Sequence, residues 1–208
     1  MNTQVKTATP IPAASASRQH ASLAPLPKRR LATHQRILTA ACSLFSRRGV
    51  ANVSVEDILL EADVSRGTFY KYFSNKEDVL KAIVLPVFGY LIERFSRLDD
   101  VDAAVVLEEV LRSYFQQWQN APEALLLAFT IGQANFSLVQ PQHDAYVQLL
   151  AGLISRIHQQ GMLRLDDQHA ASLLIARTVV PVLQSLQKTA AFESNFLAAM
   201  KGMLLRNG

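Results

Sequence analysis

A short segment around residue 70 gathers side chains that could bind a polyanion. Ser65, Arg66, Thr68, Tyr70 and Lys71 follow one another closely, and each carries a hydrogen-bond donor. Donors at the start of a helix suit phosphate oxygens and the acceptor edges of bases, because the positive end of the helix dipole points the same way. The segment therefore predicts a nucleic-acid-binding surface.

Residues for other kinds of chemistry do not come together in the sequence. The single cysteine, Cys42, excludes an internal disulfide and a cysteine metal cluster, and its small neighbours predict a buried, inert thiol. The histidines lack ligand-type partners at helical spacing, apart from weak pairs such as Asp166 with His169. Glycine-rich phosphate loops, nucleophile elbows and paired-carboxylate motifs are missing. We therefore expect no metal, no cofactor and no enzyme activity.

Positive charge is concentrated in the first third of the chain. The sequence has 21 Lys and Arg against 17 Asp and Glu, and its first acidic residue is Glu56. A basic start followed by a mildly acidic remainder favours contact with a polyanion. The run Lys28, Arg29 and Arg30 fits equally well a DNA-contacting arm and a solvated basic tail.

Helical periodicity dominates the chain after residue 30, whereas residues 1–27 are rich in proline, lack aromatics and predict a disordered arm. Ser54 with Asp57, and Ser74 with Glu77, have the spacing of helix N-terminal caps. Pro86 should kink or break the helix that follows. The predicted helices are 31–48, 54–62, 65–73, 74–98, 102–119, 122–136, 141–160, 166–187 and 191–206.

The fold class expected from this pattern is all-α. The second and third helices, with their short turn and caps, match a helix-turn-helix, in which the second helix enters the major groove. Phe69 and Phe73 would face inward, and Gly67 would let the backbone approach the groove closely. We expect an arm over 1–27, a three-helix DNA-binding domain over 28–77, and a helical effector-binding and dimerisation domain over 78–208.

Over about residues 31–85 the sequence resembles the TetR family of bacterial regulators. The resemblance rests on Thr33–Leu38, Gly67–Tyr70, Tyr72–Phe73 and Lys76–Glu77, in order and in register. Asp63 stands where the family often has glycine in the turn, and aspartate tolerates a left-handed backbone better than most residues.

This resemblance implies a cytoplasmic bacterial repressor that binds double-stranded operator DNA as a homodimer and is released by a small-molecule effector. An alternative is a helical small-molecule-binding protein whose DNA domain is vestigial. On the recognition helix, the implied contacts are Ser65, Arg66, Gly67, Thr68, Tyr70 and Lys71. Thr33 and Lys76 lie at helix starts that touch phosphate, and Lys28, Arg29 and Arg30 lie where an arm could reach a groove.

Aromatic residues cluster in the middle of the chain, where the resemblance places the effector pocket. A mostly apolar cavity with a few polar groups is the usual form of a small-molecule site, and few charges lie nearby. We expect a hydrophobic or aromatic effector bound by Tyr114, Phe115, Trp118, Phe129, Gln133 and Phe136.

The last two predicted helices carry more apolar surface than one helical layer hides. A two-fold interface would bury it, and the paired recognition helices would then face a near-palindromic operator. The expected interface residues are Val179, Leu183, Leu186, Phe196, Met200 and Met203. No contact with a membrane is expected, because the apolar stretches 124–143 and 82–92 are respectively too polar and too short to cross one.

Overall fold

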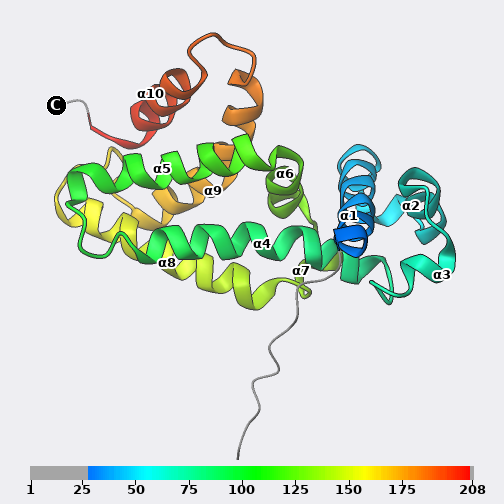
Figure 1. Ribbon diagram of the computed structural model, residues 1–208. Coiled ribbons are helices and arrows are strands. Elements are labelled where there is room, and N and C mark those ends of the chain that lie inside the picture. Colours follow the sequence, from blue (N-terminus) through cyan, green and yellow to red (C-terminus); the bar gives the residue numbers. More distant parts are fainter. Residues whose placement is uncertain (1–27, 207–208) are drawn as a thin grey trace, which may run out of the picture.

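The computed structural model of the chain describes residues 28–206, and every named element within them is a helix (Figure 1). The expected all-α class is confirmed, whereas the arm predicted over 1–27 lies outside the described residues. The elements are α1 (Lys28–Arg48), the 3₁₀ helix η1 (Val50–Asn52), α2 (Val55–Ala62), α3 (Arg66–Phe69), α4 (Lys76–Ser96), α5 (Ala103–Asn120), α6 (Pro122–Thr130), α7 (Gln133–Phe136), α8 (Gln140–Gln159), α9 (Gln168–Leu186) and α10 (Phe192–Leu204).

The helices form two groups, which we call the head (α1–α3 with η1) and the body (α4–α10). In Figure 1 the head lies at one end of the molecule, and α4 runs from it into the body between α6, α5 and α8. Helix α1 also packs against α4 and α6, so the head rests on the body through these two helices.

The head has a small apolar core to which every one of its helices contributes. Ile37 and Phe45 of α1, Ile58 of α2 and Phe69 of α3 are almost completely buried. The body core is larger and richer in aromatics, with Phe88 and Phe95 of α4 packing their rings against Tyr146 of α8. Burial of these large side chains fixes how the helices cross.

Two predicted boundaries near the head are wrong in detail. The third helix ends at Phe69 rather than Phe73, because the amides of Lys71 and Tyr72 bond three residues back instead of four. The next helix is capped by Asn75, whose side chain accepts from the Asp78 amide, rather than by Ser74 with Glu77. Asn75 and Asp78 have the same three-residue spacing as Ser74 and Glu77, so the cap of α4 lies one residue later than expected.

Two expectations about breaks in the body also need correction. Helix α4 continues through Pro86, which lies on its exposed side, so that the carbonyl left without a donor can bond to water. By contrast, the helix expected over 122–136 is divided into α6 and α7. Gly132 has φ +74 at this division, a left-handed backbone that suits glycine and cannot continue a helix.

Candidate DNA-binding surface and effector cavity

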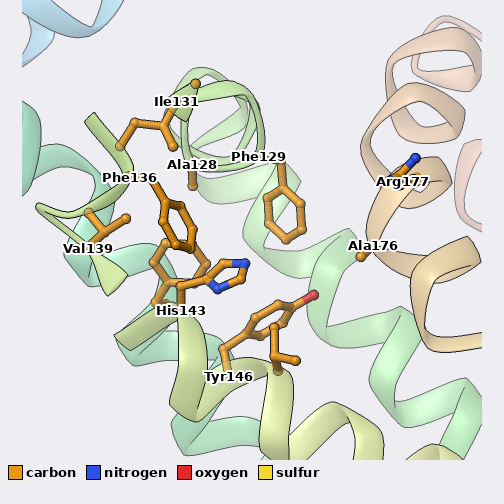
Figure 2. A pocket seen from close by; sticks show the side chains of 12 residues that line it. Ala128, Phe129, Ile131, Phe136, Val139, His143, Tyr146, Ala176 and Arg177 are labelled. Carbon is orange, nitrogen blue, oxygen red and sulfur yellow. The ribbon is translucent and has the colours of Figure 1, made fainter. Parts of the chain in front are cut away.

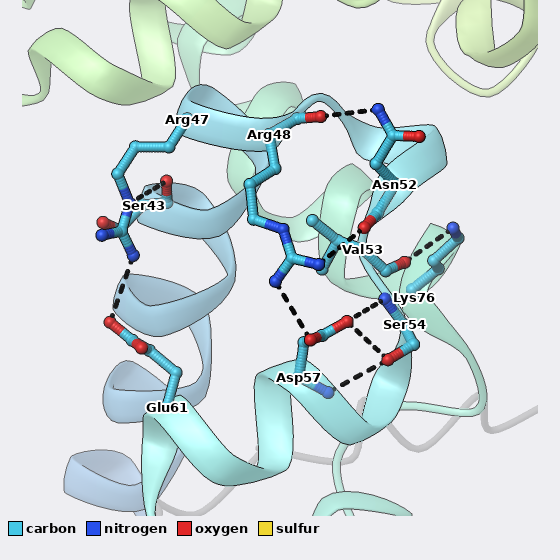
Figure 3. Close-up of polar contacts among 9 residues, drawn as sticks. All are labelled: Ser43, Arg47, Arg48, Asn52, Val53, Ser54, Asp57, Glu61 and Lys76. Carbon is cyan, nitrogen blue, oxygen red and sulfur yellow. Dashed lines mark hydrogen bonds and ion pairs between the residues drawn. The ribbon is translucent and has the colours of Figure 1, made fainter.

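Helix α2 begins at a complete capping box, as the spacing of Ser54 and Asp57 predicts (Figure 3). The Ser54 hydroxyl accepts from the Asp57 amide at 3.1 Å, and the Asp57 carboxylate accepts from the Ser54 amide at 2.8 Å. Bonds from the side chain and backbone of Ser54, and from Arg48, lower the pKa of Asp57 to about 2. The box fixes the start of the first helix of the helix-turn-helix.

The turn between α2 and α3 is held from α1. Asp63 has φ 49 and ψ 55, which is the left-handed conformation expected for a residue standing in place of glycine. Arg36 of α1 donates to the carbonyls of Ala62 and Asp63 at 2.6 and 2.8 Å. The angle between α2 and α3 therefore depends on a side chain of a third helix.

Helix α3 presents donors outward from a buried anchor. Phe69 is fully buried, whereas Tyr70 is 49% exposed and Arg66 and Lys71 are also exposed. A Cβ added at Gly67 would meet nothing within 4 Å, so this position faces open space. The arrangement leaves one convex surface free for a groove, which is how a recognition helix works.

Three of the predicted contacts are engaged within the head. The Ser65 hydroxyl caps α3, accepting from the Thr68 amide at 3.2 Å, and it lies 2.9 Å from the Thr68 hydroxyl. Arg66 pairs with Glu56 of α2, and both side chains are well exposed. An exposed pair of this kind exchanges easily for a phosphate or a base.

The residues predicted at helix starts are placed less favourably for phosphate. Lys76 donates from its ammonium group to the carbonyl of Val50 at 3.0 Å and to that of Val53 at 2.8 Å, which joins α4 to the segment just before α2. Figure 3 shows the bond to Val53. The Thr33 hydroxyl bonds the Arg29 carbonyl at 3.1 Å. Thr33 lies in the second turn of α1 rather than at a helix start, so its backbone amide is used within the helix. Lys76 is the first residue of α4, and its amide has no partner in the helix. Both phosphate contacts stay predictions.

The basic run is helical in the structure. Lys28, Arg29 and Arg30 form the first turn of α1, and the side chains of Arg29 and Arg30 are exposed. The side chain of Lys28 lies outside the described part of the chain. These cations extend the positive surface of the head at the start of α1, so a groove contact from them stays a prediction.

The body encloses a cavity of about 500 Å³ between α4, α6, α7, α8 and α9. Figure 2 shows its aromatic side chains facing one another, with the His143 ring between Phe136 and Tyr146. The lining residues are Phe88, Ala128, Phe129, Ile131, Gly132, Phe136, Val139, His143, Tyr146, Val147, Ala176 and Arg177. Size, apolar walls and a few polar groups match a small-molecule site.

The predicted effector residues are only partly at this cavity. Phe129 and Phe136 line it, whereas Tyr114 lies behind Tyr146 in the wall. Phe115 instead packs against Phe192 of α10, with ring centroids 4.9 Å apart, and Trp118 is buried elsewhere in α5. The side chain of Gln133 is outside the described part of the structure.

The polar lining residues His143, Tyr146 and Arg177 were not predicted. His143, Tyr146 and Val147 recur at three- and four-residue steps of α8, a helical face that the sequence could have shown. Arg177 belongs to α9, and only the packing of α9 on α8 and α6 brings it to the same cavity. No signal in the sequence joins these positions.

A buried pair of tyrosine hydroxyls supports the cavity wall. Tyr114 and Tyr146 are 2.6 Å apart at their oxygens and are almost fully buried. Burial raises the pKa of both phenols, so both are protonated at neutral pH. Because one hydroxyl donates to the other, the second proton remains available to an acceptor.

A second hollow of about 350 Å³ lies where α1 meets α4 and α6, and Cys42 lines it. Burial raises the pKa of the Cys42 thiol to about 11, which keeps it protonated and unreactive at neutral pH. The hollow therefore offers packing space rather than a reactive group. Among residues 28–206, no three His, Cys, Asp or Glu side chains gather in a way that could hold a metal ion.

The predicted dimer residues are mostly unavailable to a partner. Four of the six have no exposed surface in the single chain, namely Val179, Leu183, Phe196 and Met200. These four pack α9 and α10 onto the rest of the body, and an interface there needs other residues. Leu173 of α9, one of the apolar residues that the last predicted helices carry, is 42% exposed.

Helix α9 is unusually apolar for its position. Its most apolar stretch has a mean hydropathy of 1.3, and only 28% of that stretch is buried in the single chain. By length and composition alone, it is the one helix in the described part of the protein that could cross a membrane. The apolar stretches singled out in the sequence, 124–143 and 82–92, do not include this helix.

The head matches a known protein family, whereas similarity to individual relatives and solved structures extends into the body. Residues 37–83, which include the capped helix-turn-helix and its anchor Phe69, match the family described as "Bacterial regulatory proteins, tetR family". This part of the chain is a helix-turn-helix of the TetR family. The family match covers the head from Ile37 onward and the start of α4, and it confirms the resemblance seen in the sequence.

Two curated relatives of the chain come from Bacillus subtilis (strain 168). The HTH-type transcriptional regulator YvdT is 28% identical over 107 residues, which are 50% of this chain and 55% of that one. The fatty acid metabolism regulator protein is 26% identical over 174 residues, which are 77% of this chain and 89% of that one. The chain thus spans about half the length of the first relative and most of the second.

Solved structures share the fold over most of the chain. The regulator AibR, in a complex titled with isovaleryl coenzyme A and operator DNA, superposes with a TM-score of 0.67 at 20% identity. The superposition covers 83% of this chain and 98% of that one. At this identity the likeness shows the fold: a helix-turn-helix head on an all-helical body.

Proposed function

We propose that this transcriptional regulator is a dimeric repressor that binds a near-palindromic operator and is released when a small hydrophobic or aromatic effector fills the body cavity. One helix carries the proposal: α4 meets the head at Lys76 and supplies Phe88 to the cavity wall. An occupant that moves Phe88 displaces the same helix that holds the head, so the two sites are coupled through a single element.

The proposed division of labour follows from this geometry. Residues 28–77 hold the DNA, with Ser65–Lys71 facing the major groove, and residues 78–208 hold the effector and the partner subunit. AibR binds both a ligand and operator DNA on the same fold, and the fatty acid metabolism regulator is the relative with the longest match of the two curated proteins compared. These proteins support a regulator with two sites.

The dimer is supported by the exposed apolar surface of α9. Leu173 is 42% exposed, and Leu174, Val182 and Leu186 are partly exposed, so α9 has apolar surface in contact with water. Soluble proteins cover such surface with a partner, and a two-fold contact of α9 and α10 would cover it in both copies. We propose Leu173 and Leu186 at its centre.

The test begins with selection of DNA sites from a random pool by the purified protein without ligand. We expect one near-palindromic sequence to be enriched. Its affinity should fall steeply with salt, by a factor of about 10³ between 50 and 200 mM. A ligand that binds the cavity should release this DNA in a fluorescence anisotropy assay. A failure to enrich any sequence would favour a small-molecule-binding protein with a vestigial DNA domain.

A further inference from the structure

The charged and polar groups of the cavity are unevenly distributed. Of its lining residues, Arg177 is the only one with a permanently charged side chain, and none carries a carboxylate. In Figure 2, Ile131 and Val139 lie at one side of the cavity, whereas Arg177 and Ala176 lie at the other, across the Phe129 ring. The cavity therefore has an apolar end and a basic end.

Arg177 has no partner within the described part of the single chain. Its side chain is exposed at the edge of the cavity, and within residues 28–206 it forms no hydrogen bond or ion pair. Most other arginines of the body are paired, as Arg112 is with Glu108 and Arg156 is with the Leu98 carbonyl. A guanidinium without a partner presents a planar fork of donors that matches a carboxylate.

His143 forms no hydrogen bond with the described residues and lies among aromatic rings. Its Nδ1 is buried without a hydrogen bond, 3.5 Å from an Asp144 oxygen but not aligned with it. The ring packs edge-on against Phe136 and Phe88, with centroids 4.8 and 5.8 Å away. Neither ring nitrogen is bonded by a described residue, so the imidazole can offer a hydrogen bond to a ligand.

We infer that the cavity binds an amphipathic organic anion, with an alkyl or aryl body against the aromatic wall and a carboxylate-like group toward Arg177. The spare proton of the Tyr114–Tyr146 hydroxyl pair and the imidazole of His143 supply further hydrogen bonds to the bound molecule. The inference rests on the proposed function in taking this cavity as the effector site. It goes further by assigning the charge and polarity of the effector.

The test uses matched probes that differ only in the charge of one group. Decanoate, decanamide and decylamine share one body, and cinnamate, cinnamamide and cinnamylamine share another. Binding to the full chain is measured by isothermal titration calorimetry without DNA. In each set we expect the carboxylate to bind about tenfold or more tightly than the amide, and the amine to bind most weakly.

Substitutions test whether Arg177, at the basic end of the cavity, causes the preference for carboxylates. Arg177→Met should reduce carboxylate affinity about tenfold to a hundredfold and leave amide affinity unchanged, so that the preference is lost. Lys188→Met, which removes a cation just beyond α9, is the matched control and should keep it. His143→Phe preserves the ring packing and should weaken the carboxylate by a smaller factor. Thermal unfolding of each variant checks that the fold is retained.

The outcomes separate this inference from the proposed function. Equal binding of carboxylate and amide, preference for the amine, or no binding of any carboxylate up to about 5 mM would overturn the inference. A changed sedimentation coefficient of Arg177→Met with an unchanged preference would do the same, because Arg177 would then serve the subunit contact. Operator release is measured separately: carboxylates that bind but leave DNA bound would support the inference and contradict effector-driven release.

Discussion

The head and the body hold their functional side chains by different means. In the head, Tyr70 and Lys71 lie on the surface, and their positions depend on backbone caps at Ser54 and Ser65. In the body, Phe129 and Tyr146 face inward, and their positions depend on rings packed from α4 and α8. A surface that binds DNA therefore needs a rigid backbone that carries exposed side chains. A cavity instead needs side chains that are held in place by packing around an empty volume.

This difference decides how far each region tolerates change. We expect that an exposed donor at α3 can be removed at small cost in stability, because it packs against little, and that its removal lowers only the affinity for DNA. A ring of the body core is shared between folding and binding, so its removal alters both. Substitutions that uncouple the two effects therefore test the comparison directly.

The largest expected effect comes from the one buried anchor of the recognition helix. Phe69→Ala should lower the free energy of unfolding by about 3–5 kcal/mol, because it empties the centre of the head core, and should abolish DNA binding. Thermal unfolding and anisotropy measure both quantities. Leu60→Ala, the same kind of truncation at a residue that is 85% exposed, should change neither.

A smaller effect on stability but a large one on affinity is expected on the outer face of α3. Tyr70→Ala and Lys71→Ala should each weaken operator binding about tenfold to a hundredfold, with an unchanged unfolding temperature. Arg97→Ala, which removes an exposed cation at the far end of α4, is the control. Wild-type affinity in both α3 variants would show that the recognition surface has been placed wrongly.

The hydroxyl pair offers the matching experiment in the body. Tyr114→Phe leaves the buried Tyr146 hydroxyl without its partner and should lower the free energy of unfolding by about 1–3 kcal/mol. Operator affinity in the absence of effector should stay at the wild-type value. A loss of DNA binding in folded Tyr114→Phe protein would contradict the separation between the two regions.

How far each region could be predicted from the sequence follows from the range of its contacts. Ser54 and Asp57 act on neighbours within a few residues, so their spacing alone predicted their roles. The left-handed Asp63 was expected from the resemblance, because the family often has glycine at this turn. Phe115 was misplaced because helical periodicity shows that a residue is buried but not which helix covers it. Arg177 meets His143 only through the packing of α9 on α8, which local patterns do not encode.

Acid should affect the head through Asp57. The pKa of this carboxyl falls from 3.8 to about 2 in the folded state, so the carboxylate stabilises the head above about pH 4. That stability is lost as pH falls from about 4 toward 2. Asp57→Asn should flatten the dependence of unfolding temperature on pH in this range. Asp99→Asn, on an exposed loop, should retain the wild-type slope.

The smallest expected effect concerns the ion pair between Glu56 and Arg66. Glu56→Gln removes a negative charge beside the recognition helix and frees the guanidinium, so operator affinity should rise by a factor of up to about five. Glu93→Gln breaks a similar Glu–Arg pair far from the head and should leave affinity unchanged. Weaker binding of Glu56→Gln would mean that the pair orients Arg66 for DNA.

The length of α4 determines how far a small tilt at the cavity moves the end of the helix that contacts the head. At about 1.5 Å per residue, Phe88 in the cavity wall lies about 18 Å along the axis from Lys76 at the head. A tilt of α4 by only about 5° around Phe88 would carry Lys76 sideways by about 1.6 Å. The ammonium bonds to Val50 and Val53 would pass this displacement to the first helix of the helix-turn-helix. An occupant no larger than a few carbon atoms could thus shift the DNA-reading surface by more than a hydrogen bond tolerates.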